Sequence, residues 1–299
     1  MILVLPRLYL GNISDVEDVQ HLQKSGITHI LTVDSVQPDL TSFQTKFVNL
    51  LDDSIADILS CLPECLNFLK EALATTESSV LVHCHAGVSR SAAVVIAYLM
   101  NTTRCTYEEA YRRLQDVKSD IRINEEFVNQ LALFEAMGCE VDISSAIYKL
   151  YRLQKITEKY PELQKLPREV FALDPSSITQ TKEVLYRCRK CRRSLFRAES
   201  ILNHSLGAGP VAFAHKRLSV LNSSDSAKCT SYFVEPVQWM EESLLGVMDG
   251  QLLCPRCHSK LGSFNWYGEQ CSCGRWVTPA FQVHKNRVDE VKPLPICGR

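Results

Sequence analysis

Residues 79–91 read SVLVHCHAGVSRS, and this stretch decides the fold of the first half of the chain. Residues 79–83 form an apolar run that is typical of a buried strand, and a helix is expected from about residue 91. Cys84 therefore lies at the end of a strand, just before the amino terminus of a helix. Backbone N–H groups that converge at such a point form a hollow that binds anions.

The side chains of this loop have the types and the spacing of a site for phosphate chemistry. The helix amino terminus favours a thiolate at Cys84, and a thiolate is a nucleophile. Gly87 allows a tight turn round a phosphate, and Arg90 can grip two phosphoryl oxygens with its planar fork. Ser91 can donate a hydrogen bond to the departing sulfur, and His83 is expected to orient the loop and hold the thiolate. A structural cysteine before an ordinary turn is the alternative, but it leaves this joint spacing unexplained.

Working outward, the first half alternates strand-like and helix-like segments. Strands are expected over residues 8–10, 28–34, 46–51 and 79–83. Helices are expected over residues 14–24, with Ser14 and Glu17 as a capping box, over residues 57–73 and 124–137, and from residues 91 and 106. Strands separated by helices indicate an α/β domain in which a central, mostly parallel sheet is flanked by helices.

The loop HCHAGVSRS matches the signature H-C-x-x-G-x-x-R-[ST] of the cysteine-dependent protein tyrosine phosphatases. The runs LYLG (8–11) and ITHILTV (27–33), with Asn124, Phe127, Gln130 and Leu131, resemble the dual-specificity branch of that family. The resemblance covers about residues 3–140. It implies the cysteine-phosphatase fold, a shallow pocket for phosphotyrosine and phosphoserine or phosphothreonine of phosphoprotein substrates, and catalysis without a cofactor.

The same resemblance assigns phosphate binding to the loop after the cysteine. The residues concerned are His85, Ala86, Gly87, Val88, Ser89 and Arg90. None of the variable positions is lysine, whereas the lipid phosphatase relatives place lysines there. A phosphoprotein is therefore the expected substrate.

Phosphatases of this kind also need a general acid that protonates the leaving oxygen. Relatives supply it as an aspartate between a strand and a helix, and counting back from that helix places Asp52 in the role. Asp53 is one residue away and stays an alternative, whereas Asp57 is expected to cap the helix. Asn124 resembles a loop-supporting asparagine of the family, although Ile123 stands where proline is usual.

The second half of the chain has a different charge and a different cysteine content. Residues 1–150 carry 11 Lys and Arg against 20 Asp and Glu, whereas residues 151–299 carry 22 against 14. Such an asymmetry suggests two units with different partners. Eight of the 13 cysteines follow residue 180, and the apolar start of the chain lacks the features of a secretory signal. Paired cysteines are then expected to bind metal rather than to form disulfides.

Two C-x-x-C pairs and four further residues have the spacing of zinc ligands. The expected ligands are Cys188, Cys191, His204, Cys229, Cys254, Cys257, Cys271 and Cys273. They fill two closed tetrahedral sites, whose zinc ions are structural and supply folding energy to a small β-rich module. In chain order the first four would form one site and the last four the other, but interleaved pairing stays open. His215 and His258 compete with His204.

We therefore expect a phosphatase domain over residues 1–142, a helical linker over residues 143–182 and a zinc-binding domain over residues 183–299. Cations that crowd the first cysteine pair could meet RNA phosphates or an acidic protein; they are Arg187, Arg189, Lys190, Arg192 and Arg193. Aromatic residues near the last cysteines are expected to pack a small core, with base stacking as the alternative; they are Phe264, Trp266, Tyr267 and Trp276.

The runs CRKCRRSLF (188–196), PVQWM (236–240) and GSFNWYGEQCSCGRWVTPAF (262–281) resemble the zinc-containing eukaryotic branch of the dual-specificity phosphatases. The resemblance then covers nearly the whole chain. It implies two zinc ions, residence in the nucleus and cytoplasm, and a link to late assembly of the large ribosomal subunit.

The sequence thus predicts a phosphomonoester hydrolase that acts on phosphoproteins through a phosphocysteine intermediate. The rival hypothesis is a binding protein whose basic zinc domain does the essential work on pre-ribosomes, with dispensable phosphatase activity. No apolar run approaches the ~20 residues that span a bilayer, so no membrane partner is expected. We expect a monomer.

Overall fold

The computed structural model describes residues 1–177, 183–207 and 229–292. The chain divides into two compact units, Met1–Ile143 (unit 1) and Ser144–Arg299 (unit 2). Among the described residues, no helix combines the length and the apolar character that crossing a bilayer requires.

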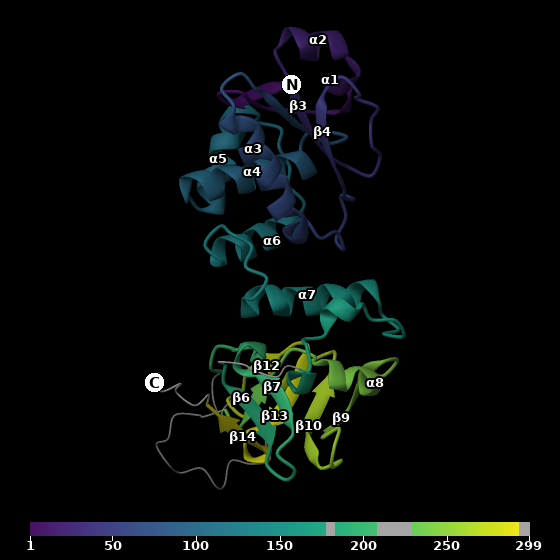
Figure 1. Ribbon diagram of the computed structural model, residues 1–299. Helices are drawn as coiled ribbons and strands as arrows, with labels where there is room; N and C mark the ends of the chain where they lie inside the picture. The colour runs from purple at the N-terminus through teal and green to yellow at the C-terminus, as the bar shows by residue number, and fades with distance from the viewer. Residues whose placement is uncertain (178–182, 208–228, 293–299) are drawn as a thin grey trace, which may run out of the picture. The chain divides into compact units, whose positions relative to one another are not determined.

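Unit 1 is built on a five-stranded sheet in the order β1-β2-β5-β3-β4 (Figure 1). Only β1 is antiparallel to its neighbour, so the expected α/β fold with a mostly parallel sheet is confirmed. The strands are β1 (Ile2–Leu5), β2 (Leu8–Gly11), β3 (His29–Asp34), β4 (Gln44–Asn49) and β5 (Val80–His83). The helices are α1 (Ile13–Glu17), α2 (Val19–Lys24), the 3-10 helix η1 (Leu59–Cys61), α3 (Leu62–Ala74), α4 (Arg90–Thr103), α5 (Tyr107–Val117) and α6 (Glu125–Ala136).

The position of β5 explains why a reactive loop follows it. β5 lies between β2 and β3 and is buried at all four residues. Leu81 packs on one face of the sheet with Val16 of α1 and Leu22 of α2. α4 is buried from Arg90 to Asn101. The loop between β5 and α4 is therefore held at the centre of the domain.

The first helix of unit 1 departs from the expectation. The predicted capping box of Ser14 and Glu17 is wrong, because Asn12 accepts from the Asp15 N–H and Asp15 accepts in return from the Asn12 N–H. Asp18 then caps a second helix, so the single expected helix is two short ones. The chain leaves β2 one residue before Asn12, which makes Asn12 the first side chain able to cap.

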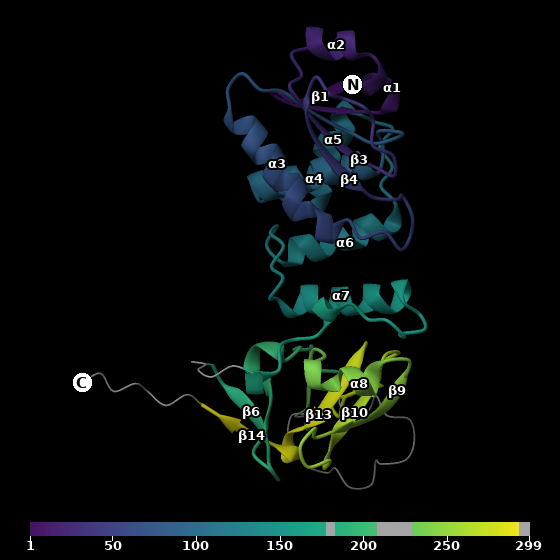
Figure 2. The same ribbon diagram turned by 45° about the vertical axis from the view of Figure 1, so that its right-hand side comes forward.

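Unit 2 consists of small antiparallel sheets. One sheet has the order β8-β13-β10-β9 and another the order β14-β6-β7, and β11 pairs with β12 (Figures 1 and 2). The strands are β6 (Leu185–Cys188), β7 (Ser194–Arg197), β8 (Ser231–Phe233), β9 (Asp249–Leu253), β10 (Lys260–Asn265), β11 (Glu269–Gln270), β12 (Trp276–Val277), β13 (Ala280–His284) and β14 (Val288–Val291). The helices are α7 (Ala146–Lys159), η2 (Arg168–Val170), η3 (Pro175–Ser177), η4 (Ala198–Ser200), η6 (Gln238–Met240), α8 (Glu241–Leu244) and η7 (Lys285–Arg287).

The stretch that we expected to be a linker supplies core side chains to unit 2. Leu153 and Ile156 of α7, and Leu163 after it, belong to the same buried cluster as Phe196 and Phe281. Lys149 of α7 also forms an ion pair with Glu235 at 2.9 Å. Residues from 144 onward thus fold together with the cysteine-rich sequence.

Candidate active site and metal centres

The Cys84 sulfur lies at the carboxyl end of β5 and is almost completely buried. It accepts a hydrogen bond from the Gly87 N–H at 3.2 Å and one from the Ser91 hydroxyl at 3.0 Å. The Ser89 hydroxyl, at the N-cap position of α4, caps none of the helix's N–H groups. The first turn of α4 therefore keeps N–H groups that can bind an anion beside the sulfur.

Position 87 requires glycine because of its backbone conformation and because neighbouring atoms leave no room for a Cβ atom. Its φ of +72° lies in the left-handed region, and a Cβ atom there would lie 2.6 Å from the Gly11 carbonyl oxygen. The backbone N–H of Ile13 also donates to the carbonyl of His85 at 3.1 Å. The turn between β2 and α1 thus fixes the path of the loop.

We expect Gly87→Ala to lower both stability and turnover. The left-handed conformation alone costs a non-glycine residue about 1–3 kcal/mol, and relief of the contact with Gly11 would displace the loop. A displacement of about 1 Å costs about 10²-fold in rate. Gly138→Ala is the matched control, because Gly138 has a φ of +76° but no atom within 4 Å of the added Cβ. Denaturation should show a loss for both variants, whereas aryl phosphatase assays should show a loss only for Gly87→Ala.

Arg90 is held by a carboxylate that the sequence analysis missed. Its Nη1 donates to Asp34 Oδ1 at 2.7 Å and to the Leu50 carbonyl at 3.2 Å. Both side chains of the pair are about nine-tenths buried. The buried Nε of Arg90 has no hydrogen-bond partner among the described residues, so the side of the guanidinium that carries Nε can still donate. That side can bind the oxygens of a phosphoryl group.

His83 is buried, and its Nε2 lies 2.7 Å from the Thr32 hydroxyl of the neighbouring strand β3. Burial lowers the pKa of His83 to about 4, although the Cys84 backbone and the carboxylates of Asp34 and Asp15 favour the protonated ring. The ring is therefore neutral at pH 7. The His83 side chain thus contacts β3, and it ties two neighbouring strands together beneath the loop.

Asp52 is the exposed aspartate that touches the loop. Its Oδ1 accepts from the Ser89 hydroxyl at 2.8 Å and from the Asn124 side-chain amide. Asn124 also caps α6, because its Oδ1 accepts from the Phe127 N–H at 2.8 Å. Asn124 therefore supports Asp52 rather than the phosphate-binding loop directly.

The two alternative candidates for the general acid, Asp53 and Asp57, accept hydrogen bonds from backbone N–H groups of nearby residues. Asp53 accepts from the Ile55 N–H at 3.0 Å, and Asp57 accepts from the Ser60 N–H at 2.9 Å. Asp57 thereby binds an N–H group of η1, which leads into α3, although Ile58 holds the N-cap position. Asp52, by contrast, accepts from Ser89 of the loop.

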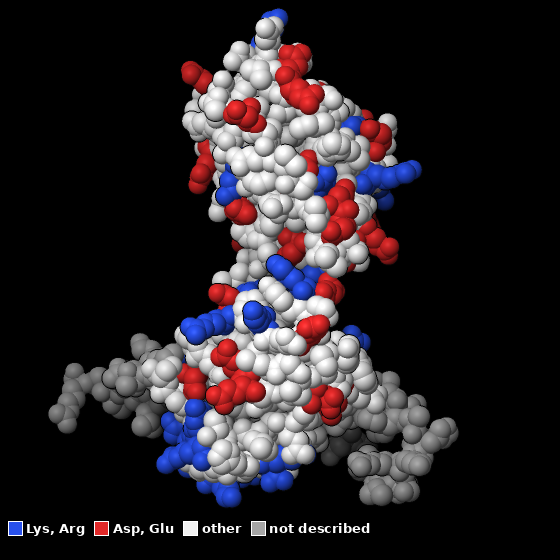
Figure 3. Space-filling view, turned by 90° about the vertical axis from the view of Figure 1, so that its right-hand side faces the viewer, with Lys and Arg blue, Asp and Glu red and all other residues white. Residues whose placement is uncertain are grey.

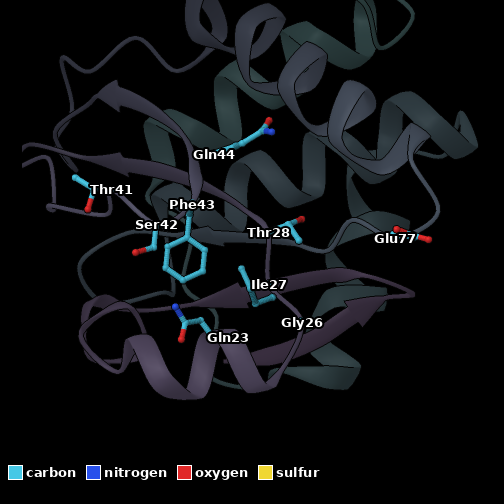
Figure 4. A pocket seen from close by; sticks show the side chains of 9 residues that line it. All are labelled: Gln23, Gly26, Ile27, Thr28, Thr41, Ser42, Phe43, Gln44 and Glu77. Carbon is cyan, nitrogen blue, oxygen red and sulfur yellow. The ribbon is translucent and has the colours of Figure 1, made fainter.

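The remaining loop positions differ in exposure, and the described pocket lies elsewhere. His85 and Ala86 are exposed, Val88 is half-buried and Ser89 is buried. The pocket of Figure 4 contains Thr28 and Gln44, where β3 and β4 begin. Cys84 follows the end of β5, which runs parallel to β3, so this pocket is at the opposite edge of the sheet. Its lining residues include no cysteine, histidine, lysine or arginine.

Four cysteines from the two C-x-x-C pairs converge in unit 2 and form the first candidate metal centre. Their sulfur atoms lie within 4.8 Å of one another, and the residues are Cys188, Cys191, Cys254 and Cys257. The Cys191–Cys254 and Cys188–Cys257 sulfur separations are 3.5 and 3.8 Å. A tetrahedral ion with bonds of about 2.3 Å requires sulfur atoms about 3.8 Å apart, so the cluster fits one.

The two pairs have the same local shape. Each is followed by a residue in the left-handed conformation, Arg192 (φ 64°) or His258 (φ 54°). The N–H of that residue donates to the carbonyl of the first cysteine, at 2.8 Å for Arg192 and 2.9 Å for His258. We call these two turns the knuckles, residues 188–192 and 254–258.

The second candidate metal centre consists of His204, Cys229, Cys271 and Cys273, whose side-chain nitrogen and sulfur atoms also lie within 4.8 Å of one another. The Nε2 atom of His204 lies 3.4 Å from the Cys229 sulfur and 3.5 Å from the Cys273 sulfur. Bond lengths of about 2.0 Å to nitrogen and 2.3 Å to sulfur give a nitrogen–sulfur distance of about 3.5 Å around a tetrahedral ion. This centre can therefore also hold a metal ion.

The pairing of the ligands is interleaved, so the grouping in chain order is wrong. The first cysteine pair shares a centre with the second pair rather than with His204 and Cys229. The strands supply the reason, because β6 ends at the first knuckle and β9 ends at the second. His258 is exposed and lies in neither centre. His215 and Cys297 lie outside the described residues.

The expected cluster of cations beside the first knuckle is largely neutralised by carboxylates. Arg193 forms an ion pair with Asp174 at 2.7 Å, and Arg189 and Arg192 both contact Asp289. These three arginines therefore meet acidic partners within unit 2.

A smaller set of exposed cations spans both knuckles and the start of β10. Lys190, Arg256 and Lys260 are exposed, and in the described part of the chain none of them forms an ion pair. Arg187 is half-buried. Figure 3 shows Lys and Arg side chains gathered on the lower part of unit 2. We call Lys190, Arg256 and Lys260 the knuckle cations.

The aromatic residues near the second centre divide into two pairs. Phe264 and Trp266 are buried, and the Trp266 ring packs edge-on against Phe281 at 4.9 Å, as a core role requires. Tyr267 and Trp276 are 71% and 59% exposed, so the expected core role is wrong for these two.

A buried thiol at a helix amino terminus, with an arginine and a hydroxyl beside it, defines a cysteine-dependent phosphatase site. The family described as "Dual specificity phosphatase, catalytic domain" matches residues 8–137. The chain belongs to the dual-specificity protein phosphatases, and it is an enzyme of that class.

The similarity to relatives extends through both units. "Dual specificity protein phosphatase 12" of Homo sapiens is 58% identical over 100% of this chain and 91% of its own length. "Tyrosine-protein phosphatase YVH1" of Saccharomyces cerevisiae is 30% identical over 96% of this chain and 90% of its own length. Among solved structures, a human tyrosine phosphatase-like serine/threonine/tyrosine-interacting protein is 34% identical, with a TM-score of 0.43, and covers 45% of this chain and 94% of its own.

Proposed function

We propose that this phosphatase hydrolyses phosphoproteins through a covalent phosphocysteine formed on Cys84. The observation that carries the proposal is the geometry of the Cys84 sulfur, which receives the Gly87 N–H and the Ser91 hydroxyl and lies in the loop that ends at Arg90. Both donors stabilise a thiolate. The unpaired Nε of Arg90 supplies a donor for the phosphoryl oxygens.

In the first step the Cys84 sulfur attacks phosphorus while the bond from phosphorus to the substrate oxygen breaks. The protonated carboxyl group of Asp52 gives its proton to that oxygen, so the alcohol or phenol leaves neutral. Arg90 and the N–H groups of the loop bind the three equatorial oxygens as charge develops on them.

In the second step a water molecule attacks the phosphocysteine and the phosphorus–sulfur bond breaks. The carboxylate of Asp52 takes the water proton, and the Ser91 hydroxyl donates to the departing thiolate of Cys84. Inorganic phosphate leaves and the starting state returns. Because Ser91 already lies 3.0 Å from the sulfur, this hydrogen bond needs no rearrangement.

We expect Asp52→Asn to lower kcat by about 10²–10⁴-fold, the usual contribution of a positioned acid. The loss should be larger for phosphoserine peptides than for para-nitrophenyl phosphate, because an alkoxide is a poorer leaving group than a nitrophenolate. Asp53→Asn is the matched control and should leave turnover nearly intact. If Asp53→Asn shows the leaving-group dependence instead, the acid has been assigned to the wrong aspartate.

The metal ions of unit 2 are proposed to be two structural zinc ions. One centre offers four thiolates and the other three thiolates and an imidazole, which are the donors that zinc prefers. All four positions at each centre come from the protein, so neither ion has an open position for substrate. We also propose that the metal-binding domain begins at about residue 144, since α7 shares its core.

A second proposed function of unit 2 is binding to RNA of the pre-ribosomal large subunit, in the nucleus and cytoplasm. The knuckle cations favour it, because exposed cations that are free of carboxylates can contact phosphates. The rival view, in which this binding is the essential function, is tested in cells. Growth with Cys84→Ser but not after deletion of residues 144–299 would support it.

We expect the triple variant Lys190→Glu, Arg256→Glu, Lys260→Glu to keep its metal but to bind large-subunit particles more weakly. The slope of log affinity against log salt is negative, and each lost phosphate contact makes it shallower by about 0.7–0.9, so the loss of three contacts reduces its magnitude by about 2–3. Sedimentation with purified particles at several salt concentrations measures both quantities. The control with the same charge change is Lys24→Glu, Lys70→Glu, Arg112→Glu in unit 1. Equal losses for the two variants would mean that the effect is one of net charge alone.

A further inference from the structure

Exposed apolar side chains gather on the loops around the candidate active site. Seven large apolar residues of unit 1 are exposed, and Val36, Leu51 and Ile55 are three of them, at 73%, 54% and 60%. All three lie in the segments that follow β3 and β4, at residues 35–43 and 50–58. The two strands run parallel to β5, so both segments leave the sheet at the edge where Cys84 lies.

The same two segments hold the groups that act on the phosphate. Val36 lies two residues after Asp34, which binds Arg90. Leu51 lies between the Leu50 carbonyl, which accepts from Arg90, and Asp52. The Leu50 N–H donates to the Asp34 carbonyl at 3.1 Å, so the segments are joined. The apolar side chains are therefore beside the phosphate site, and we call Val36, Leu51 and Ile55 the apolar rim.

The segments that carry the apolar rim offer no positive charge to a substrate. Residues 35–43 and 50–58 contain four aspartates, Asp39, Asp52, Asp53 and Asp57, and no lysine or arginine. An acidic residue of a peptide that lies along the rim would meet these carboxylates and would find no lysine or arginine in the two segments. An aliphatic or aromatic side chain would instead remove apolar surface from water on both molecules.

We propose that Val36, Leu51 and Ile55 form a subsite that binds an apolar residue next to the phosphorylated residue of the protein substrate. The proposal rests on the proposed phosphatase mechanism and adds a substrate class to it. Phosphopeptides with apolar flanking residues are preferred, and those with acidic flanking residues are disfavoured.

The test compares phosphotyrosine peptides that share one sequence and carry Leu, Ser or Glu on both sides of the phosphotyrosine. For the full chain, kcat/KM should be about tenfold higher with Leu than with Ser, the scale of a small apolar contact. It should be lowest with Glu. High salt should reduce the difference between Ser and Glu, which is electrostatic, and should leave the preference for Leu.

The variant Val36→Ser, Leu51→Ser, Ile55→Ser should bring the ratio of Leu to Ser peptides close to one. Both values of kcat/KM are measured with the same protein preparation, so a partial loss of folded protein does not change their ratio. The matched control is Leu3→Ser, Val19→Ser, Val117→Ser, which removes three exposed apolar residues outside the rim and should keep the ratio of the unaltered chain.

Para-nitrophenyl phosphate has no flanking residues. Its hydrolysis therefore distinguishes failure of the apolar subsite from failure of the phosphocysteine mechanism. Equal rates on the Leu and Ser peptides, in an enzyme that hydrolyses this compound, would refute the apolar subsite and leave the mechanism intact. A rim variant that keeps the full ratio would refute the assignment to these three residues. No hydrolysis of the compound by well-folded protein would refute the mechanism itself.

Discussion

A Cys84→Ser variant should lose all measurable hydrolysis of aryl phosphates and should keep the fold of unit 1. A serine hydroxyl stays protonated at neutral pH and is a far weaker nucleophile than a thiol sulfur, so the Gly87 N–H and the Ser91 hydroxyl would face a group that cannot attack phosphorus at a useful rate. Removal of the nucleophile costs about 10⁶-fold in other enzymes with covalent intermediates. Initial rates with para-nitrophenyl phosphate measure the loss of hydrolysis, and circular dichroism measures whether the fold is kept.

The matched control for that variant is Cys61→Ser. Burial raises the pKa of the Cys61 thiol to about 12, with smaller contributions from Asp57 and Glu64. Cys61 is therefore a neutral thiol at pH 7, and its replacement should leave turnover close to normal. Rapid alkaline denaturation during turnover of a ³²P-labelled substrate should trap a labelled protein with Cys61→Ser but not with Cys84→Ser. Appreciable turnover by folded Cys84→Ser protein would rule out the phosphocysteine mechanism.

The part of the site that is contiguous in sequence could be predicted from the sequence. Cys84, Gly87 and Ser91 lie in one strand–loop–helix segment, so their spacing alone brings the donors to the sulfur. The helix expected from residue 106 was predictable for the same reason, because Thr106 and Glu109 form a capping box at the start of α5. Local geometry is fixed once the local elements are known.

Asp34 shows why other parts of the site could not be predicted. It ends β3, and it meets Arg90 because β3 lies beside β5 in a sheet whose order differs from the chain order. A charged residue at the end of an otherwise buried strand was the available signal. Only the strand order, however, shows which cation it faces.

The candidate metal centres likewise depend on contacts between residues that are far apart in sequence. Cys191 and Cys254 are 63 residues apart in sequence, and their sulfur atoms are 3.5 Å apart. Residue types and spacing predicted the eight ligands, and the structure groups the same eight. Their pairing follows from where β6 and β9 end. The apolar residues of the expected linker find partners that come later in the chain, such as Phe196 and Phe281, so local sequence does not show which core they join.

Removal of metal should unfold unit 2 and leave the phosphatase chemistry of unit 1 in place. Zinc binding to small structural sites is worth about 10–16 kcal/mol, which is as large as the whole stability of a typical domain. A strong chelator should therefore abolish amide protection in β6, β10 and β13, as measured by hydrogen exchange on the full chain. Hydrolysis of para-nitrophenyl phosphate should continue, because the core of unit 1 holds none of the eight ligands. Loss of that activity together with the metal would contradict the assignment of structural roles to both ions.

Double variants then decide how the ligands are shared. The purified chain should hold two zinc ions, and half-buried ligands can be replaced without leaving a hydroxyl in the core. With the interleaved centres, Cys191→Ser with Cys257→Ser removes ligands of one ion, so one zinc per chain remains. Cys191→Ser with Cys229→Ser removes ligands of both ions, so none remains. Pairing in chain order predicts the reverse, with no zinc left in the first double variant and one in the second. Metal analysis of these two proteins therefore separates the two arrangements, because each predicts the opposite order of zinc content.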